Sequence, residues 1–298
     1  MTLFAFLGAI ESGLIYSIVA LAVFISFRIL NFPDLTVDGS FPLGAAVAVI
    51  LIIAGYNPYL ASFAAFLSGC LAGMVTAFLN VRFKILHLLA SILVMTALYS
   101  INLRIMGRPN LSLLFTNTIF TPIEILGLPK IYCKIICLSV IVVAVKLFLD
   151  FFLKSQVGLA MRAAGMNPHM ARAQGVSTNQ MVYMGIALSN GLVAFAGALF
   201  AQVNAFTDIS IGIGTIIYGL AAVILGQTIL SRKIIFIGTL ACILGSILYR
   251  LAIAMALNTD MLGLKTSDLS LITSLLVVIA LILPASKRKL QALSKNAK

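Results

Sequence analysis

The chain has 298 residues, of which 62% are hydrophobic and only 9% are charged. Soluble domains carry about 25% charged residues, so this composition excludes an ordinary soluble protein. Apolar runs of about 20 residues, the length that crosses a bilayer as a helix, recur along the chain, whereas barrel strands would alternate polar and apolar residues. We therefore expect an all-α polytopic membrane protein, with residues 1–298 forming a single transmembrane domain.

The net charge of +12 does not indicate a nucleic-acid partner. The lysines and arginines lie between the apolar runs and form no basic stripe with interleaved aromatic residues, so membrane topology explains them better. The four cysteines lie within or beside apolar runs, where packing is the expected role, and we predict no metal site.

Nine apolar segments predict about nine transmembrane helices, within a range of eight to ten. The first segment has no basic n-region and no cleavage site of small residues, so we expect a retained span. The second is short and contains Pro42 near its start, which indicates a broken or partial span. The segments cover residues 2–27, 40–55, 58–80, 86–103, 131–149, 181–203, 211–227, 234–256 and 270–284.

The distribution of basic residues predicts the orientation. With the Lys287–Lys289 cluster placed in the cytoplasm, 14 of the 20 lysines and arginines fall on that side. The loop at 150–180 is then cytoplasmic, and the N-terminus lies outside.

Polar residues inside apolar runs are costly in lipid and mark candidate pathway positions. We single out Glu11, Asn102, Asn190 and Asn204 as candidates for lining a translocation path. For each asparagine, hydrogen bonding between packed helices is the simpler explanation, and Glu11 could equally lie protonated or paired near the outer interface. Asp208 faces outward in this topology and is a candidate contact for an external partner.

No catalytic residue is predicted. The chain has no Gly-x4-Gly-Lys-Ser/Thr loop for ATP and no His-Glu-x-x-His motif, and His87 and His169 stand alone.

The polar loop at 150–180 contains signals for short helices. Asn167 suits a helix N-cap, Pro168 the first helical position, and Gly175 a left-handed stop, and a second short helix is predicted from Val157 to Ala164, before Gly165. An ordinary solvated loop is the alternative.

We interpret this loop as a docking element for a soluble partner. Arg162 and Arg172 can pair with acidic groups, and an apolar face can enter a groove. That face is expected to comprise Leu159, Met161, Met166 and Met170.

An internal similarity links the two halves. Asn31-Phe-Pro-Asp34-Leu-Thr36-Val-Asp38-Gly follows the first long span, and Asn204-Ala-Phe-Thr-Asp208-Ile-Ser-Ile-Gly212 follows a later one. The two stretches lie on opposite faces in the predicted topology, as inverted repeats require, although chance is a serious rival. An N-cap role for Asp38 or Ser40 is the simpler reading of the first stretch.

The residues also resemble a known family. The stretch from Asn31 to Ala46 and the stretch Gly158–Val176 resemble permeases of bacterial ABC importers for branched-chain amino acids and simple sugars, the second stretch matching their cytoplasmic coupling loop. The stretches 95–110 and 212–226 resemble the tryptophan and tyrosine branch of that family.

The resemblance implies a permease in the bacterial cytoplasmic membrane that carries a small organic solute, with aromatic amino acids favoured. It implies a homodimer, two ATP-binding cassette subunits that bind ATP and dock on Arg162, Gly165, Asn167, Pro168, Arg172 and Gly175, and an extracytoplasmic solute-binding protein. No cofactor is expected on this chain. An ion-gradient-driven secondary transporter is the alternative, and a membrane scaffold is a third option without positive support.

Overall fold

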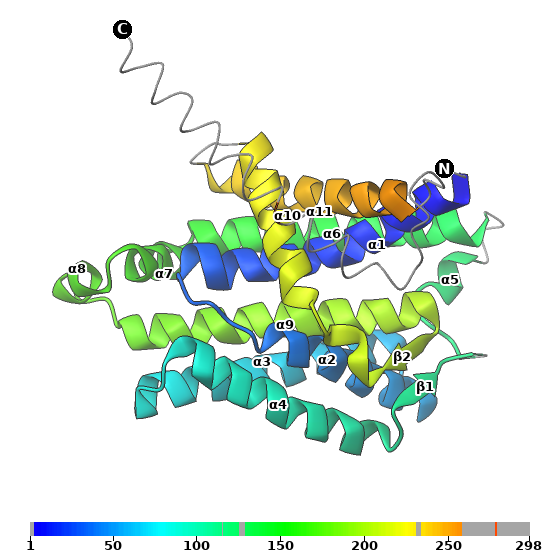
Figure 1. Ribbon diagram of the computed structural model, residues 1–298, viewed down its shortest axis with the longest axis horizontal. Coiled ribbons are helices and arrows are strands. Elements are labelled where there is room, and N and C mark those ends of the chain that lie inside the picture. Colours follow the sequence, from blue (N-terminus) through cyan, green and yellow to red (C-terminus); the bar gives the residue numbers. More distant parts are fainter. Residues whose placement is uncertain (1–2, 115, 125–128, 231–233, 258–277, 279–298) are drawn as a thin grey trace, which may run out of the picture.

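The computed structural model describes residues 3–114, 116–124, 129–230, 234–257 and 278, and these form an all-helical bundle with one small two-stranded sheet (Figure 1). Within these residues, seven helices are long and apolar enough to cross a membrane, and one apolar helix is shorter. The helical expectation is therefore confirmed. Eight of the nine predicted segments coincide with helices, and the ninth, 270–284, lies almost entirely outside the described residues.

The first half of the chain contains four long or apolar helices and a short strand. Helix α1 ends in six π-helical residues, η1, and α2 is the partial span that the sequence predicted. The bounds are α1 Leu3–Val23, η1 Phe24–Ile29, α2 Val37–Ile53, α3 Pro58–Phe83, α4 His87–Met106, β1 Asn110–Ser112 and α5 Thr121–Glu124.

The second half begins with a long helix that leads into two short ones. Strand β2 pairs antiparallel with β1, so the C-terminal ends of α4 and α9 meet at the same end of the bundle. The bounds are α6 Lys130–Lys154, α7 Gln156–Met166, α8 Pro168–Ala173, α9 Thr178–Asn204, β2 Phe206–Asp208, the 3₁₀ turn η2 Ile209–Gly212, α10 Thr215–Ile229 and α11 Ile235–Leu257.

Helices α1 and α9 form the centre of the bundle, and most of their residues are buried. Small residues allow close packing there: a Cβ on Gly44 of α2 would lie 1.9 Å from the carbonyl oxygen of Ala194 in α9. Helices α3, α4 and α6 expose large apolar side chains along their outer faces, as helices in contact with lipid do.

The bundle has two distinct ends. Helices α7 and α8 lie at one end, which we call the α8 end, and the strands, α5 and the N-terminus lie at the other, the β1–β2 end (Figure 1). Arg28, Arg82, Lys84 and Lys154 belong to helix termini at the α8 end. The charge distribution likewise placed these four residues on one side of the membrane.

Candidate functional site

Two short helices, α2 and α10, begin in the interior of the bundle, and their first turns are in contact. The carboxylate of Asp38 in α2 accepts hydrogen bonds from the backbone N–H groups of Gly214 (3.0 Å) and Ile216 (2.8 Å) at the start of α10. A Cβ on Gly212 would lie 2.0 Å from the carbonyl oxygen of Asp38, so only glycine allows this approach. Asp38 therefore caps α10 from α2, and the expected N-cap role of Asp38 or Ser40 in its own helix is wrong.

A buried polar network fixes the start of α2 against its neighbours. Asp34 accepts hydrogen bonds from the Thr36 backbone N–H (2.9 Å) and from the Asn190 side-chain amide of α9 (2.6 Å). The Ser40 hydroxyl donates to Asn190 (2.7 Å), and the Thr36 and Thr76 hydroxyls lie 2.8 Å apart. A buried polar group costs free energy unless it is hydrogen-bonded, so this network ties α2, α3 and α9 together deep in the bundle.

An arginine lies between aromatic rings beside this junction. The guanidinium carbon of Arg250 in α11 is 4.0 Å from the ring centroid of Tyr16 in α1 and 4.8 Å from that of Tyr218 in α10. Tyr16 also stacks on Phe41 of α2, with centroids 5.8 Å apart. Four helices thus contribute to one cluster at the level where α2 and α10 begin.

The predicted pathway residues do not form one group. Asn190 and Asn102 are both fully buried and both contact the first turn of α2, Asn102 by donating to the Gly39 carbonyl (3.2 Å). Glu11 lies on α1, half-buried, and its Oε1 has no hydrogen-bond partner. Asn204 is exposed at the C-terminal end of α9, where its amide donates to the Phe200 carbonyl (2.9 Å).

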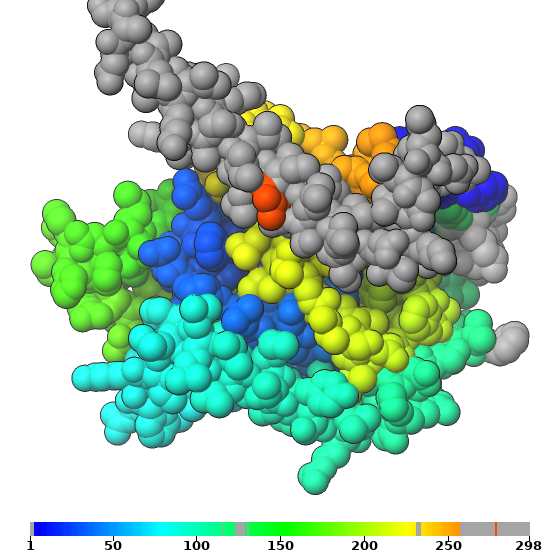
Figure 2. All heavy atoms as spheres, in the orientation of Figure 1, coloured from blue at the N-terminus to red at the C-terminus, as the bar shows by residue number. Residues whose placement is uncertain are grey.

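The predicted short helices are present at the α8 end. Asn167 caps α8 by accepting from the Met170 N–H (3.1 Å), Pro168 occupies the first position, and Gly175 follows with φ at +81°. Helix α7 extends to Met166, so Gly165 lies within it rather than after it, because Gly165 packs against another backbone instead of ending a helix. Figure 2 shows α7 and α8 projecting from the body of the molecule (green, at left).

The side chains of α7 and α8 divide between the bundle and the surface. Leu159, Met166 and Met170 are 52%, 88% and 63% exposed, whereas Met161 is fully buried. The expectation that Met161 belongs to the exposed apolar face is therefore wrong. The Met161 side chain points from α7 toward the bundle, and its sulfur lies next to Gly185 of α9. Arg172 is exposed and donates to the Thr178 hydroxyl (2.8 Å), while Arg162 is half-buried.

Helix α7 touches the end of the first span directly. A Cβ on Gly165 would lie 1.8 Å from the carbonyl oxygen of Ile29, at the end of η1. Only the segment from Leu30 to Thr36 separates this contact from the start of α2. A displacement of α7 therefore has a short covalent route to the junction of α2 and α10.

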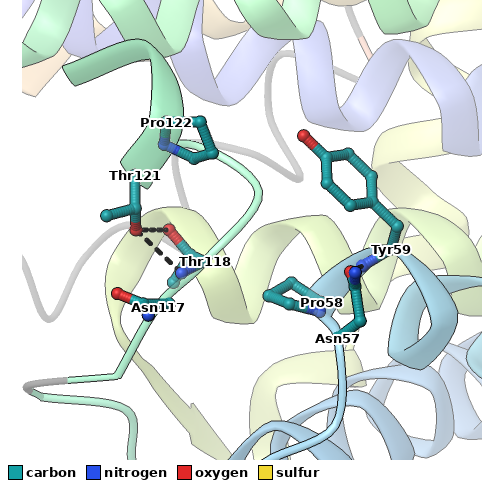
Figure 3. A pocket seen from close by; sticks show the side chains of 7 residues that line it. All are labelled: Asn57, Pro58, Tyr59, Asn117, Thr118, Thr121 and Pro122. Carbon is teal, nitrogen blue, oxygen red and sulfur yellow. Dashed lines mark hydrogen bonds between the residues drawn. The ribbon is translucent and has the colours of Figure 1, made fainter. Parts of the chain in front are cut away.

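Several polar side chains lie at the β1–β2 end. Asp208 is half-buried, accepts from the Ser210 N–H (2.8 Å) and pairs in register with Asn110. A nearby pocket lies between the turn before α3 and the segment leading into α5 (Figure 3). It is lined by Asn57, Pro58, Tyr59, Asn117, Thr118, Thr121 and Pro122.

Sequence reasoning missed two features of the interior. One is the use of Asp38 to cap a helix that begins 176 residues later. The other is a buried ion pair between Lys146 and Asp150 in α6, with Asp150 also accepting from the Thr239 hydroxyl of α11 (2.6 Å). Their spacing of four residues inside an apolar run was the available signal for the ion pair.

A bundle with seven candidate membrane spans among the described residues, and with two shorter helices meeting inside it, is compatible with a membrane transport protein. The sequence pattern of the family described as "Branched-chain amino acid transport system / permease component" matches residues 5–284. The chain belongs to this family.

Two curated relatives are similar over almost the whole chain. A tyrosine transport system permease protein of Clostridioides difficile (strain R20291) is 37% identical over 272 residues, covering 91% of this chain and 88% of the relative. An uncharacterized protein of Rickettsia prowazekii (strain Madrid E) is 35% identical over 277 residues, covering 92% and 95%. No solved structure matches the chain significantly.

The chain is therefore a multi-pass membrane protein and the permease component of an ABC transport system for amino acids, a transport subunit rather than an enzyme. Family membership decides against the ion-gradient-driven alternative.

Proposed function

We propose that this permease imports an aromatic amino acid, with tyrosine as the first candidate, across the bacterial cytoplasmic membrane. The proposed solute rests on one observation, the similarity to a tyrosine transport system permease at 37% identity over 91% of the chain. We further propose a homodimer that works with two ATP-binding cassette subunits and an extracytoplasmic binding protein. ATP binds to the cassette subunits, and this chain needs no cofactor.

The α7–α8 segment is the proposed docking surface for the ATP-binding cassette subunit. Its exposed methionines and Leu159 offer an apolar face, and the exposed Arg172 offers a positive charge. Asn167 and Pro168 stiffen α8, Gly175 ends the segment, and Gly165 packs α7 against the bundle. Arg162 is proposed to pair with an acidic group of the cassette subunit. The contact between Gly165 and Ile29 supports transmission of movement from this surface to the interior.

The proposed translocation path runs past the junction of α2 and α10. Half-length helices whose N-termini meet inside the bilayer commonly form transport sites. Asn102 and Asn190 hold the α2 side of this junction, and Glu11 and Asn204 are proposed to border the path toward the outer face.

Repeated local geometry supports an inverted repeat. The first span, Leu3–Ile29, and the span Thr178–Asn204 both have 27 residues, and each is followed by a residue with positive φ, Asn31 and Ala205. Asp34 then accepts from the N–H two residues ahead, as Asp208 does, and a short helix follows in both halves. The N-terminus, the β1–β2 end and Asp208 are proposed to face outward, with Asp208 and the neighbouring pocket contacting the binding protein.

Uptake of radiolabelled L-tyrosine tests the proposed solute. We expect cells of the host organism without this gene to lose energy-dependent tyrosine uptake and to regain it from a plasmid copy. Labelled L-leucine and D-ribose serve as comparison solutes. If the deletion reduces uptake of leucine or ribose and leaves that of the aromatic amino acids unchanged, the proposed solute class is wrong.

A further inference from the structure

Arg250 places a cation inside the long apolar helix α11. Its Nε is inaccessible to solvent and has no hydrogen-bond partner, and no carboxylate among the described residues forms an ion pair with it. Asp38, the nearby acid on α2, already accepts from two backbone N–H groups of α10. An unpaired charge in a membrane span is costly and indicates a functional site.

The two tyrosines hold the guanidinium in place without neutralising it. Tyr16 and Tyr218 present their rings to Arg250 at 4.0 and 4.8 Å, a cation–π arrangement that stabilises the charge and restricts its orientation. The two rings are themselves in contact, with centroids 5.3 Å apart. The guanidinium is therefore preorganised, and its Nε–H has no acceptor among the described residues.

The location of the cluster connects it to the proposed path. Tyr218 lies in the first turn of α10, and Tyr16 stacks on Phe41 in the first turns of α2. Phe200 of α9 adds an edge-on ring to Phe41 at 5.6 Å. Arg250 thus lies at the junction of the two short helices, among aromatic side chains from α1, α2, α9 and α10.

We propose that Arg250 binds the α-carboxylate of the solute during its passage, while Tyr16 and Tyr218 contact the solute's apolar or aromatic side chain. Arginine matches a carboxylate with two parallel hydrogen bonds, and aromatic rings pack on aromatic rings. A solute carboxylate would supply the anion that the described protein residues do not. This inference rests on the proposed function, because it requires an amino acid as solute.

The test compares Arg250 variants in the complete complex reconstituted in proteoliposomes, with ATP inside and the binding protein loaded with L-tyrosine outside. We expect Arg250→Met to lower the maximal uptake rate at least about tenfold, the scale of losing a charge-assisted hydrogen bond. The concentration of loaded binding protein that gives half-maximal uptake should stay unchanged, since docking occurs at the outer surface. Arg104→Met, an exposed arginine on α4, is the matched control and should transport normally.

Each outcome decides the inference. An assembled Arg250→Met complex with wild-type uptake overturns it. If Arg250→Met fails to assemble, Arg250→Lys decides: it keeps the cation between the rings but not the paired hydrogen bonds, so normal uptake by this variant also overturns the inference. If the wild-type complex carries another amino acid instead of tyrosine, the proposed solute fails, but the Arg250 test proceeds with that amino acid. A wild-type complex that carries only solutes without a carboxylate overturns the inference itself.

Discussion

Single side chains in this permease connect elements that lie far apart in the sequence, and Asp38 is the clearest example. It satisfies two N–H groups at the start of α10, which would otherwise be unpaired inside the bundle. Asp38→Ala removes both hydrogen bonds, and loss of a helix cap costs about 0.5–2 kcal/mol. We predict a lower midpoint of thermal unfolding for the purified chain and a several-fold loss of uptake.

Asp208→Ala is the matched control for Asp38→Ala. Asp208 also accepts from a backbone N–H, that of Ser210, but at the surface of the β1–β2 end. Water can replace its hydrogen bond there, so its unfolding midpoint should change less. Equal midpoint shifts for the two variants would mean that the junction of α2 and α10 is no more important for stability than a surface turn.

The sequence allowed part of this residue-level picture to be predicted. Asn102 and Asn190 stood out because polar groups in apolar runs need partners, and both do contact the start of α2. The partners themselves were not predictable, because the groups that Asp38 and Asn102 contact are backbone atoms, which every residue carries. Arg250 was counted only as a topological charge, since nothing in its neighbourhood in the sequence indicates two tyrosines from other helices.

Helix α7 depends on one glycine for its position against the first span. In Gly165→Ala the new methyl group would overlap the Ile29 carbonyl, so α7 must move away or tilt. Overpacking of this kind costs about 1–3 kcal/mol. We predict that the variant inserts normally but retains less ATP-binding cassette subunit on co-purification and loses most uptake.

Two other glycines make controls for Gly165→Ala. Gly8 in α1 has open space around it, so Gly8→Ala should leave both measurements unchanged. Gly175 also has open space but a φ of +81°, so Gly175→Ala adds backbone strain of about 1–2 kcal/mol without a clash. Full retention of the cassette subunit by Gly165→Ala would show that the contact between α7 and Ile29 does not position the docking surface.

The ion pair in α6 connects the helix that leads into α7 with α11. Lys146 and Asp150 are 6% and 4% exposed, Lys146 lies 3.5 Å from the Phe236 ring centroid, and Asp150 accepts from Thr239. Asp150→Ala leaves a buried lysine unpaired, which costs about 3–5 kcal/mol. We predict a marked loss of thermal stability for Asp150→Ala and substantial recovery in the double variant Lys146→Met/Asp150→Leu.

This comparison separates the net contribution of the ion pair to stability from the free energy lost when only one partner is removed. Well-packed apolar residues can replace a buried ion pair without loss of stability. Lys154→Met, at the exposed end of the same helix, is the single-charge control. If the double variant is as unstable as Asp150→Ala, the pair contributes specific interactions that packing cannot replace.

Element boundaries were predicted best where apolar runs are long and worst where helices are short. The runs at 58–80 and 181–203 became Pro58–Phe83 and Thr178–Asn204, because length and hydrophobicity alone define a span. Helix α8 was predicted from its capping residues, which act locally. The position where α10 starts depends instead on Asp38 and Gly212, which meet only in the folded chain.

The whole molecule should span the membrane with the α8 end in the cytoplasm. The described helix termini at that end carry Arg28, Arg82, Lys84 and Lys154, and the positive-inside rule places such residues on the cytoplasmic side. Ser177 is exposed at the α8 end and Asn117 is exposed at the β1–β2 end, so a cysteine at either position is open to a reagent. With a membrane-impermeant maleimide, we predict labelling of Asn117→Cys in intact cells and of Ser177→Cys only after permeabilisation.

The unmodified chain, whose cysteines lie in or beside apolar runs, gives the background labelling. Labelling of Ser177→Cys alone in intact cells would reverse the orientation and place the proposed docking surface outside, where no ATP-binding subunit could reach it.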